Sequence, residues 1–222
     1  MITLHHLNQS RSKRIIWLLE ELGQPYHIEH YQRNEHTRLA PPELTKIHPL
    51  GKSPVIEIDG KVLAESGAIT EYLIERFAPE RLAPARDHQD YADYLYWIHF
   101  AESSAILPLL LKLFVDMDGA ETNFLARYAD TEITKVTGHL EQSLAGRDYL
   151  VADKLTGADI MMSFILDILA NNNAIAGYPN IERYQQQLAS HTSYQAAERT
   201  EAKYPLGSRI KEQDSQLSFK ND

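Results

Sequence analysis

The fold is decided by the stretch Pro54-Val55-Ile56-Glu57-Ile58-Asp59-Gly60-Lys61-Val62-Leu63-Ala64. Two short apolar runs flank an Asp-Gly pair, which is the strongest short-range signal for a β-hairpin. The spacing of Ile69, Leu73 and Phe77 then predicts a helix directly after the second strand. The hairpin and this helix together predict a ββα unit over residues 54–77.

The segment before the hairpin predicts a βαβ unit. Residues 2–7 alternate in polarity like a strand, residues 8–11 form a polar loop, and the apolar positions of residues 12–22 have helical spacing. Gly23 ends this helix, and residues 26–31 form the next strand. Such a parallel crossover is right-handed. Residues 1–78 therefore predict a four-stranded mixed sheet with helices packed on it, and a short helix is expected near Pro41-Pro42.

The pattern changes after residue 78. Residues 79–87 are rich in proline and charge and are interpreted as a linker, and no convincing strand pattern follows them. Helical patterns cover residues 88–115, 121–144, 156–170, 180–189 and 193–202. We therefore predict an α/β domain followed by an all-helical domain over residues 88–205, with a polar tail at residues 206–222.

Composition excludes several classes of function. The net charge of −9 over 222 residues disfavours nucleic acid as a partner. The chain has no cysteine, so any sulfur chemistry must use sulfur carried by a ligand. The ten histidines show no metal-binding spacing, and we expect no metal. We found no signal peptide and no apolar run of about 20 residues, so we expect a cytoplasmic protein without a membrane partner.

Three short motifs indicate a ligand. Glu65-Ser66 places an acid and a hydroxyl directly before a predicted helix, and Pro54 lies at the start of a strand. These two motifs favour a surface that binds the backbone and the charged ends of a small peptide. Ser10, in the loop after the first strand, adds a hydroxyl suited to holding and activating a peptide thiol.

These motifs resemble the glutathione S-transferase family. The match rests on Ser10 four residues before Arg14, on Ser53-Pro54-Val55, on Glu65-Ser66, and on Thr156-Gly157-Ala158-Asp159 in the helical half. It covers about residues 1–200, and the run from Ser10 to Leu22 looks most like a serine-type bacterial and fungal branch. The resemblance implies an N-terminal thioredoxin-like βαβαββα domain followed by a helical-bundle domain, with glutathione as co-substrate.

Ser10 is the expected thiolate donor. Lowering a thiol pKa by about two units requires about 2.7 kcal/mol, and one charge-assisted hydrogen bond supplies about 1.5–3 kcal/mol. A single hydroxyl at a helix N-terminus is therefore sufficient, without a strong base. Ser12 is the rival donor, although its position also suits the N-cap of the first helix. Ser10, in turn, could simply bond the local backbone.

The remaining glutathione contacts follow from the resemblance. A cis bond before Pro54 would present the Val55 backbone to the cysteinyl residue, whereas the structural alternative is a proline that opens an edge strand. Glu65 would accept from the ligand ammonium and Ser66 would donate to the adjacent carboxylate; the alternative is a capping serine beside a solvated acid. Lys52 is expected to meet the glycyl carboxylate or else to be an ordinary surface lysine.

The helical half supplies the second substrate site in this prediction. Tyr94, Trp97, Phe100 and Leu107 are candidates for an apolar wall, although aromatic residues at helical spacing also suit a core or a dimer contact. Thr156 and Asp159 have the spacing of a structural capping box. Asp167 lies in the most apolar helix and requires a partner that the sequence does not identify.

The predicted function is that of a glutathione transferase. The thiolate would attack a small electrophile or, in a peroxidase variant, a hydroperoxide oxygen, and the family usually forms homodimers. One alternative is a non-enzymatic glutathione-binding carrier or interaction protein of the same fold. Thiol-disulfide exchange is a weaker alternative, because the chain lacks cysteine.

Overall fold

A computed structural model describes residues 1–119 and 121–205 of the chain. The N-terminal half contains a four-stranded sheet of β1 (Ile2–Leu7), β2 (Tyr26–Tyr31), β3 (Val55–Ile58) and β4 (Lys61–Ala64), in the order β2-β1-β3-β4. β1 pairs with β2 in parallel, and the other two pairs are antiparallel. The mixed sheet predicted from the sequence is therefore confirmed.

The hairpin forms where the Asp-Gly pair predicted it. Asp59 and Gly60 have φ values of 50° and 75°, the left-handed backbone that a tight hairpin turn requires. α1 (Ser12–Leu22) crosses between the parallel strands, and α2 (Ser66–Phe77) follows β4 and packs against α1. Their shared core includes Ile15, Leu19 and Leu73, each 0% exposed. The short helix expected near Pro41-Pro42 is the 3₁₀ helix η1 (Pro42–Lys46).

The predicted linker is partly helical. Pro79 and Glu80 begin α3 (Pro79–Leu82), whose Leu82 is buried against the N-terminal half. Proline is well tolerated at the first position of a helix, because that backbone position has no intrahelical N–H partner to lose. The stretch interpreted as a linker therefore contains a short helix.

The long helix predicted over residues 88–115 has a different form. It consists of α4 (Tyr91–Phe100), the π-helical turn η2 (Ala101–Ala105) and α5 (Ile106–Asp118). Pro108 cannot supply the N–H that would bond the carbonyl of Ser104, so the helix widens just before it. By length and composition alone this 28-residue run could cross a membrane, but core helices satisfy the same test, and α4 and α5 pack on other helices.

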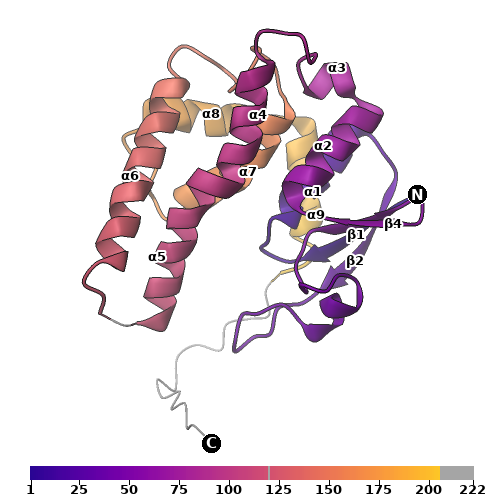
Figure 1. Cartoon of the computed structure of the whole chain (residues 1–222), viewed down its shortest axis with the longest axis horizontal. Coiled ribbons are helices and arrows are strands. Elements are labelled where there is room, and N and C mark those ends of the chain that lie inside the picture. Colours follow the sequence, from indigo (N-terminus) through magenta and orange to yellow (C-terminus); the bar gives the residue numbers. More distant parts are fainter. Residues whose placement is uncertain (120, 206–222) are drawn as a thin grey trace, which may run out of the picture.

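The remaining helices complete the second half. They are α6 (Leu125–Ser143), α7 (Gly157–Asn171), α8 (Pro179–Ala189) and α9 (Thr192–Glu201). α5 and α6 lie side by side as the arm farthest from the sheet, whereas α7 contacts α1, α2, α4 and α8 (Figure 1). α6 begins four residues later than residue 121, the predicted start. The predicted tail at residues 206–222 lies outside the described residues.

The chain returns to its N-terminal half through α9. α9 packs extensively along α1 (Figure 1), and the Trp17 indole N–H donates to Ser193 Oγ at 3.0 Å. Beyond the helix, the Tyr204 ring stacks on His30 of β2, with ring centroids 4.3 Å apart. The end of the predicted helical domain is thus part of the surface beside β1 and β2.

Candidate functional site

Strand register places the predicted ligand residues at one end of the sheet. Val55 is aligned with His5 of β1 on one side and with Ala64 of β4 on the other. Adjacent strands lie about 4.8 Å apart. The loop after β1, the start of β3 and the Glu65-Ser66 pair after β4 therefore lie in a row, which brings three motifs from separate parts of the sequence to one edge.

Ser10 and Ser12 are adjacent in this row but differ in environment. Their hydroxyl oxygens lie 3.0 Å apart; Ser10 is 6% exposed and Ser12 is 0% exposed. Ser10 Oγ accepts from the Ser12 backbone N–H at 3.1 Å, so the local bond expected as its structural role is present. That bond uses a lone pair of the Ser10 oxygen and does not use its hydroxyl proton.

Ser12 does not cap α1, so the N-cap prediction is wrong. Arg11 already has helical backbone angles of −58° and −12°, and Ser12 is consequently the first residue inside the helix. Its side chain turns inward instead. Ser12 Oγ lies 2.6 Å from His6 Nδ1 and donates to the Leu7 carbonyl at 3.3 Å. Ser12 is thus a buried link between β1 and α1.

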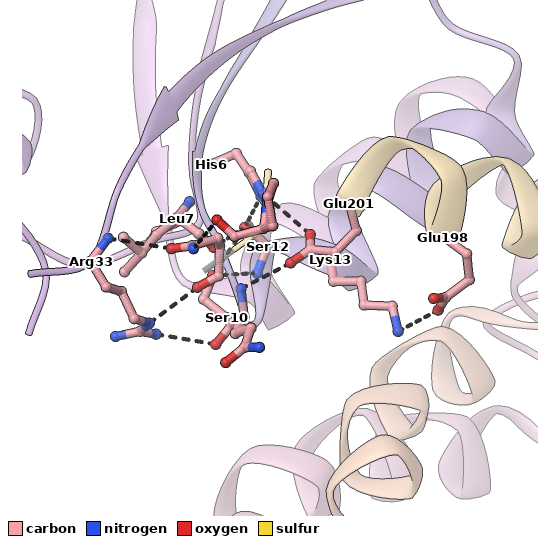
Figure 2. A network of polar contacts seen from close by, with 12 residues as sticks. His6, Leu7, Ser10, Ser12, Lys13, Arg33, Glu198 and Glu201 are labelled. Carbon is pink, nitrogen blue, oxygen red and sulfur yellow. Dashed lines mark hydrogen bonds and ion pairs between the residues drawn. The ribbon is translucent and has the colours of Figure 1, made fainter. Parts of the chain in front are cut away.

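The loop that carries Ser10 is held from two sides, as Figure 2 shows. The Arg33 guanidinium donates to the carbonyls of Asn8 and Gln9 at 3.1 and 3.2 Å. On the other side, Glu201 accepts from the Gln9 backbone N–H at 2.9 Å. Sequence reasoning missed both residues, because neither lies near the loop in the chain.

The Ser53–Pro54 peptide bond is cis, as the resemblance implied. Val55, however, is fully buried in a central strand with neighbours on both sides, so β3 is not an edge strand. An added peptide strand needs an unpaired backbone, and the backbone outside the ladder here belongs to Ser53 rather than Val55. The contact expected at Val55 stays a prediction, and Ser53, the residue before the proline, is a further candidate for the backbone contact. Ser53 Oγ also donates to the His5 carbonyl at 2.8 Å.

Glu65 adopts an unusual backbone conformation. Its φ and ψ are 69° and 114°, a region that residues with side chains rarely enter and that costs about 1–3 kcal/mol. Its side chain is exposed, and Ser66 follows as the first residue of α2 with 4% exposure. Ser66 is therefore not the N-cap considered from the sequence, but its N–H and hydroxyl lie at the positive end of the helix. Lys52 is exposed nearby in the chain.

If Glu65 accepts from the glutathione ammonium, as the resemblance implies, replacing it with glutamine should weaken glutathione binding about tenfold, because the side chain would keep its shape and lose its charge. Isothermal titration calorimetry measures this affinity. Glu75→Gln is the matched control, since it makes the same charge change on the solvent face of α2, where Glu75 pairs with the exposed Arg86. Equal affinities in the two variants would refute the placement of the ligand ammonium.

Two arginines of α1 reach the helical half. Arg14 is completely buried, and its Nη1 lies 2.7 Å from Glu102 Oε1, while Arg11 Nε donates to Glu102 Oε2 at 2.7 Å. Burial lowers the pKa of Arg14 to about 10, although Glu102 opposes that shift. Glu102 lies within the π turn, which directs its carboxylate toward α1. This ion pair joins the two halves beneath the Ser10 loop.

Asp167 obtains the partner that the sequence did not identify. Lys13 Nζ lies 2.8 Å from its carboxylate and also meets Glu198 of α9, and the Tyr194 hydroxyl donates to Asp167 at 3.1 Å. The capping box of α7 is confirmed: Thr156 and Asp159 exchange bonds, and Asp159 is 0% exposed. Both acids are therefore committed to structure.

The four residues predicted to line the second substrate site do not form one open wall. Tyr94, Trp97 and Phe100 are 4%, 5% and 8% exposed, whereas Leu107 is 59% exposed. Trp97 stacks on His139 of α6 with ring centroids 5.4 Å apart, and Phe100 packs against Trp97. These three aromatic side chains belong to the helical core, which was the structural alternative for their spacing.

In residues 1–119 and 121–205, no group of three or more His, Asp or Glu side chains has the arrangement of a metal site. The fold and the site define a thioredoxin-like domain joined to a helical domain, with a hydroxyl, a cis-proline and a helix N-terminus along one sheet edge.

Comparisons with known proteins identify the family to which this combination of fold and site belongs. Residues 1–75 match the model of the glutathione S-transferase N-terminal domain, and residues 104–191 match that of the C-terminal domain. Glutathione S-transferase 3 of Schizosaccharomyces pombe is 34% identical over 218 residues, covering 90% of this chain and 88% of the relative. The chain belongs to the glutathione S-transferase family.

Solved structures agree with this assignment. A glutathione S-transferase crystal structure from Actinobacillus pleuropneumoniae is 40% identical, with a TM-score of 0.83 over 91% of this chain and 93% of that one. Ure2p5 from Phanerochaete chrysosporium, cocrystallised with 1-(S-glutathionyl)-2,4-dinitrobenzene, is 25% identical, with a TM-score of 0.73 over 91% and 94% of the two chains.

Proposed function

We propose that this protein is a serine-type glutathione transferase in which the Ser10 hydroxyl donates a hydrogen bond to the glutathione thiolate. The observation that carries the proposal is the position of Ser10 at the start of α1, in the row with Ser53, Glu65 and Ser66. Ser10 is favoured over Ser12, because Ser12 is completely buried and its hydroxyl already contacts His6 and Leu7.

The ligand fits this row by chemistry. Glutathione carries an ammonium and a carboxylate at its γ-glutamyl end, a thiol in the middle, and a carboxylate at its glycyl end. Glu65 would accept from the ammonium, Ser66 would donate to the adjacent carboxylate at the N-terminus of α2, and Lys52 would meet the glycyl carboxylate. The backbone of Ser53 would pair with the cysteinyl residue. This order leaves the sulfur on the side of the β1 loop.

The activated sulfur would attack an electrophilic carbon and displace its leaving group. The cocrystallised ligand of Ure2p5 is the product of such a reaction, and it supports conjugation for a family member of similar fold. Attack on a hydroperoxide oxygen is the second reaction open to the same thiolate.

We also propose a cytoplasmic homodimer. Leu113, Phe114 and Met117 on α5 are exposed, which supports an association surface there.

Replacing Ser10 with alanine should raise the pKa of the thiol of bound glutathione by about one to two units, because it removes one charge-assisted hydrogen bond to sulfur. The measurement is a pH titration of thiolate absorbance at saturating glutathione. Ser143→Ala, which removes a hydroxyl that donates to the His139 carbonyl within α6, should leave the titration unchanged.

Turnover separates the transferase from a carrier of the same fold. A lowered thiol pKa with no reaction on any electrophile or hydroperoxide would favour the carrier. An unchanged pKa in Ser10→Ala would assign the donor to another group and reject the proposal.

A further inference from the structure

A chain of polar atoms runs inward from Ser10 to α9. Ser10 Oγ lies 3.0 Å from Ser12 Oγ, Ser12 Oγ lies 2.6 Å from His6 Nδ1, and His6 Nε2 lies 3.2 Å from Glu201 Oε2. Figure 2 shows these side chains converging from β1, the loop, α1 and α9. Ser12 and His6 are 0% exposed and Ser10 is 6% exposed, so Ser10 is the outer end of the chain.

Counting protons shows that the links depend on one another. Each contact between two of these atoms needs one proton between them, and each hydroxyl has only one to give. If Ser12 donates to His6, then Ser10 must donate to Ser12, and its proton is not available to a ligand. If Ser12 instead donates to Ser10, then His6 Nδ1 must carry a proton and donate to Ser12. Only this second arrangement frees the Ser10 proton for sulfur.

The inner end of the chain decides which arrangement holds. His6 Nε2 and Glu201 Oε2 are buried and 3.2 Å apart, and neither atom makes a hydrogen bond in the described part of the chain. With the proton on Nε2, the imidazole faces a carboxylate and Nδ1 accepts from Ser12. With the proton on Glu201, the carboxyl group faces an unprotonated Nε2, and Nδ1 donates. Moving this one proton therefore lets Ser12 donate to Ser10 at 3.0 Å, in place of the Leu7 carbonyl at 3.3 Å, and this frees the Ser10 proton.

The surroundings of His6 disfavour a charged imidazole. Burial lowers the pKa of His6 to about 4, with His30 of β2 adding to the effect, and Tyr204 packs against its ring. Burial raises the pKa of Glu201, and Glu198 and Asp167 act in the same direction against Lys13 and the Gln9 N–H. Both shifts favour a proton on the carboxyl group over a charged imidazole.

We propose that His6 and Glu201 are positioning residues that accept, through Ser12, the proton that the glutathione thiol loses at Ser10. In this step the S–H bond breaks as Ser10 Oγ gains the proton and passes its own to Ser12. Ser12 passes its proton to His6 Nδ1, and Nε2 passes its proton to Glu201. One S–H bond is replaced by one carboxyl O–H bond, and the single negative charge moves from Glu201 to sulfur.

The relay rests on the proposed role of Ser10 and predicts an unusual proton balance. Thiolate formed in this way releases no proton to solvent, whereas thiolate formed by simple ionisation releases one. Proton release on binding is measured by calorimetry in buffers of different ionisation enthalpy, as the difference between glutathione and S-methylglutathione. The wild-type protein should show a thiolate signal near neutral pH with little proton release.

Glu201→Gln removes the final proton acceptor and keeps the side-chain shape. We expect about tenfold less thiolate at neutral pH, corresponding to a rise of about one unit in the pKa of the bound thiol. The thiolate that still forms at higher pH should release one full proton. Glu75→Gln is the control, because it removes the same charge from an exposed pair with Arg86 on α2, outside the chain of contacts.

The outcomes separate the two proposals. Loss of thiolate in Ser10→Ala, together with wild-type behaviour of Glu201→Gln, would overturn the relay and leave the role of Ser10 intact. Full proton release by the wild-type protein would also overturn it, whether or not the variants fold. Unchanged thiolate in Ser10→Ala would instead overturn the proposed function.

Discussion

Replacing Asp159 with alanine is expected to lower the free energy of unfolding by about 4 kcal/mol. Asp159 is completely buried, and its carboxylate accepts from the backbone N–H groups of Leu150 and Thr156 and from the Tyr184 hydroxyl, at 2.7–3.0 Å. Alanine leaves these donors without partners, at about 1–3 kcal/mol each before relaxation. Denaturant unfolding followed by circular dichroism measures the loss.

A matched surface variant sets the baseline for this result. Asp116→Ala on α5 removes a carboxylate whose side chain is 57% exposed and which meets only the exposed Lys112 in the described residues, so it should cost less than about 0.5 kcal/mol. A loss below about 1 kcal/mol for Asp159→Ala would show that water or backbone movement replaces the carboxylate. The capping box would then contribute little to the stability of α7.

The second large effect is expected at Glu102. Glu102→Ala leaves the fully buried Arg14 without its carboxylate, and breaking a buried ion pair from one side costs about 3–5 kcal/mol. The expected loss is about 3 kcal/mol, because Glu102 itself is 29% exposed. Arg11 loses the same partner. Chemical denaturation is again the measurement.

Two further variants identify the cause of that loss. Adding Arg14→Met to Glu102→Ala should recover at least half of the stability, because it removes the unpaired charge and keeps much of the volume. Glu75→Ala breaks the exposed pair with Arg86 and should have almost no effect. If the double variant is less stable than Glu102→Ala, the loss arises from packing rather than from charge.

Interactions between residues close together in the sequence determined most of the secondary-structure elements of this protein. The Asp59-Gly60 turn, the helix periodicities and the Thr156–Asp159 capping box involve residues at most a few positions apart, so one stretch of chain is sufficient to specify each of them. The residues expected to bind glutathione were proposed for the same reason, since they occur at strand ends and helix starts. The resemblance to a family then supplied their roles, which remain predictions for each residue.

Only the tertiary structure decided which groups surround those residues. Glu201 meets the Ser10 loop from far along the chain, and Glu102 meets Arg14 through a π turn whose only sequence signal was Pro108. The aromatic spacing on α4 was visible, but periodicity does not specify whether a helix face meets a partner helix or solvent, and α6 and α7 cover it. Local pattern sets the elements, whereas burial and long-range charge pairing depend on how the whole chain packs.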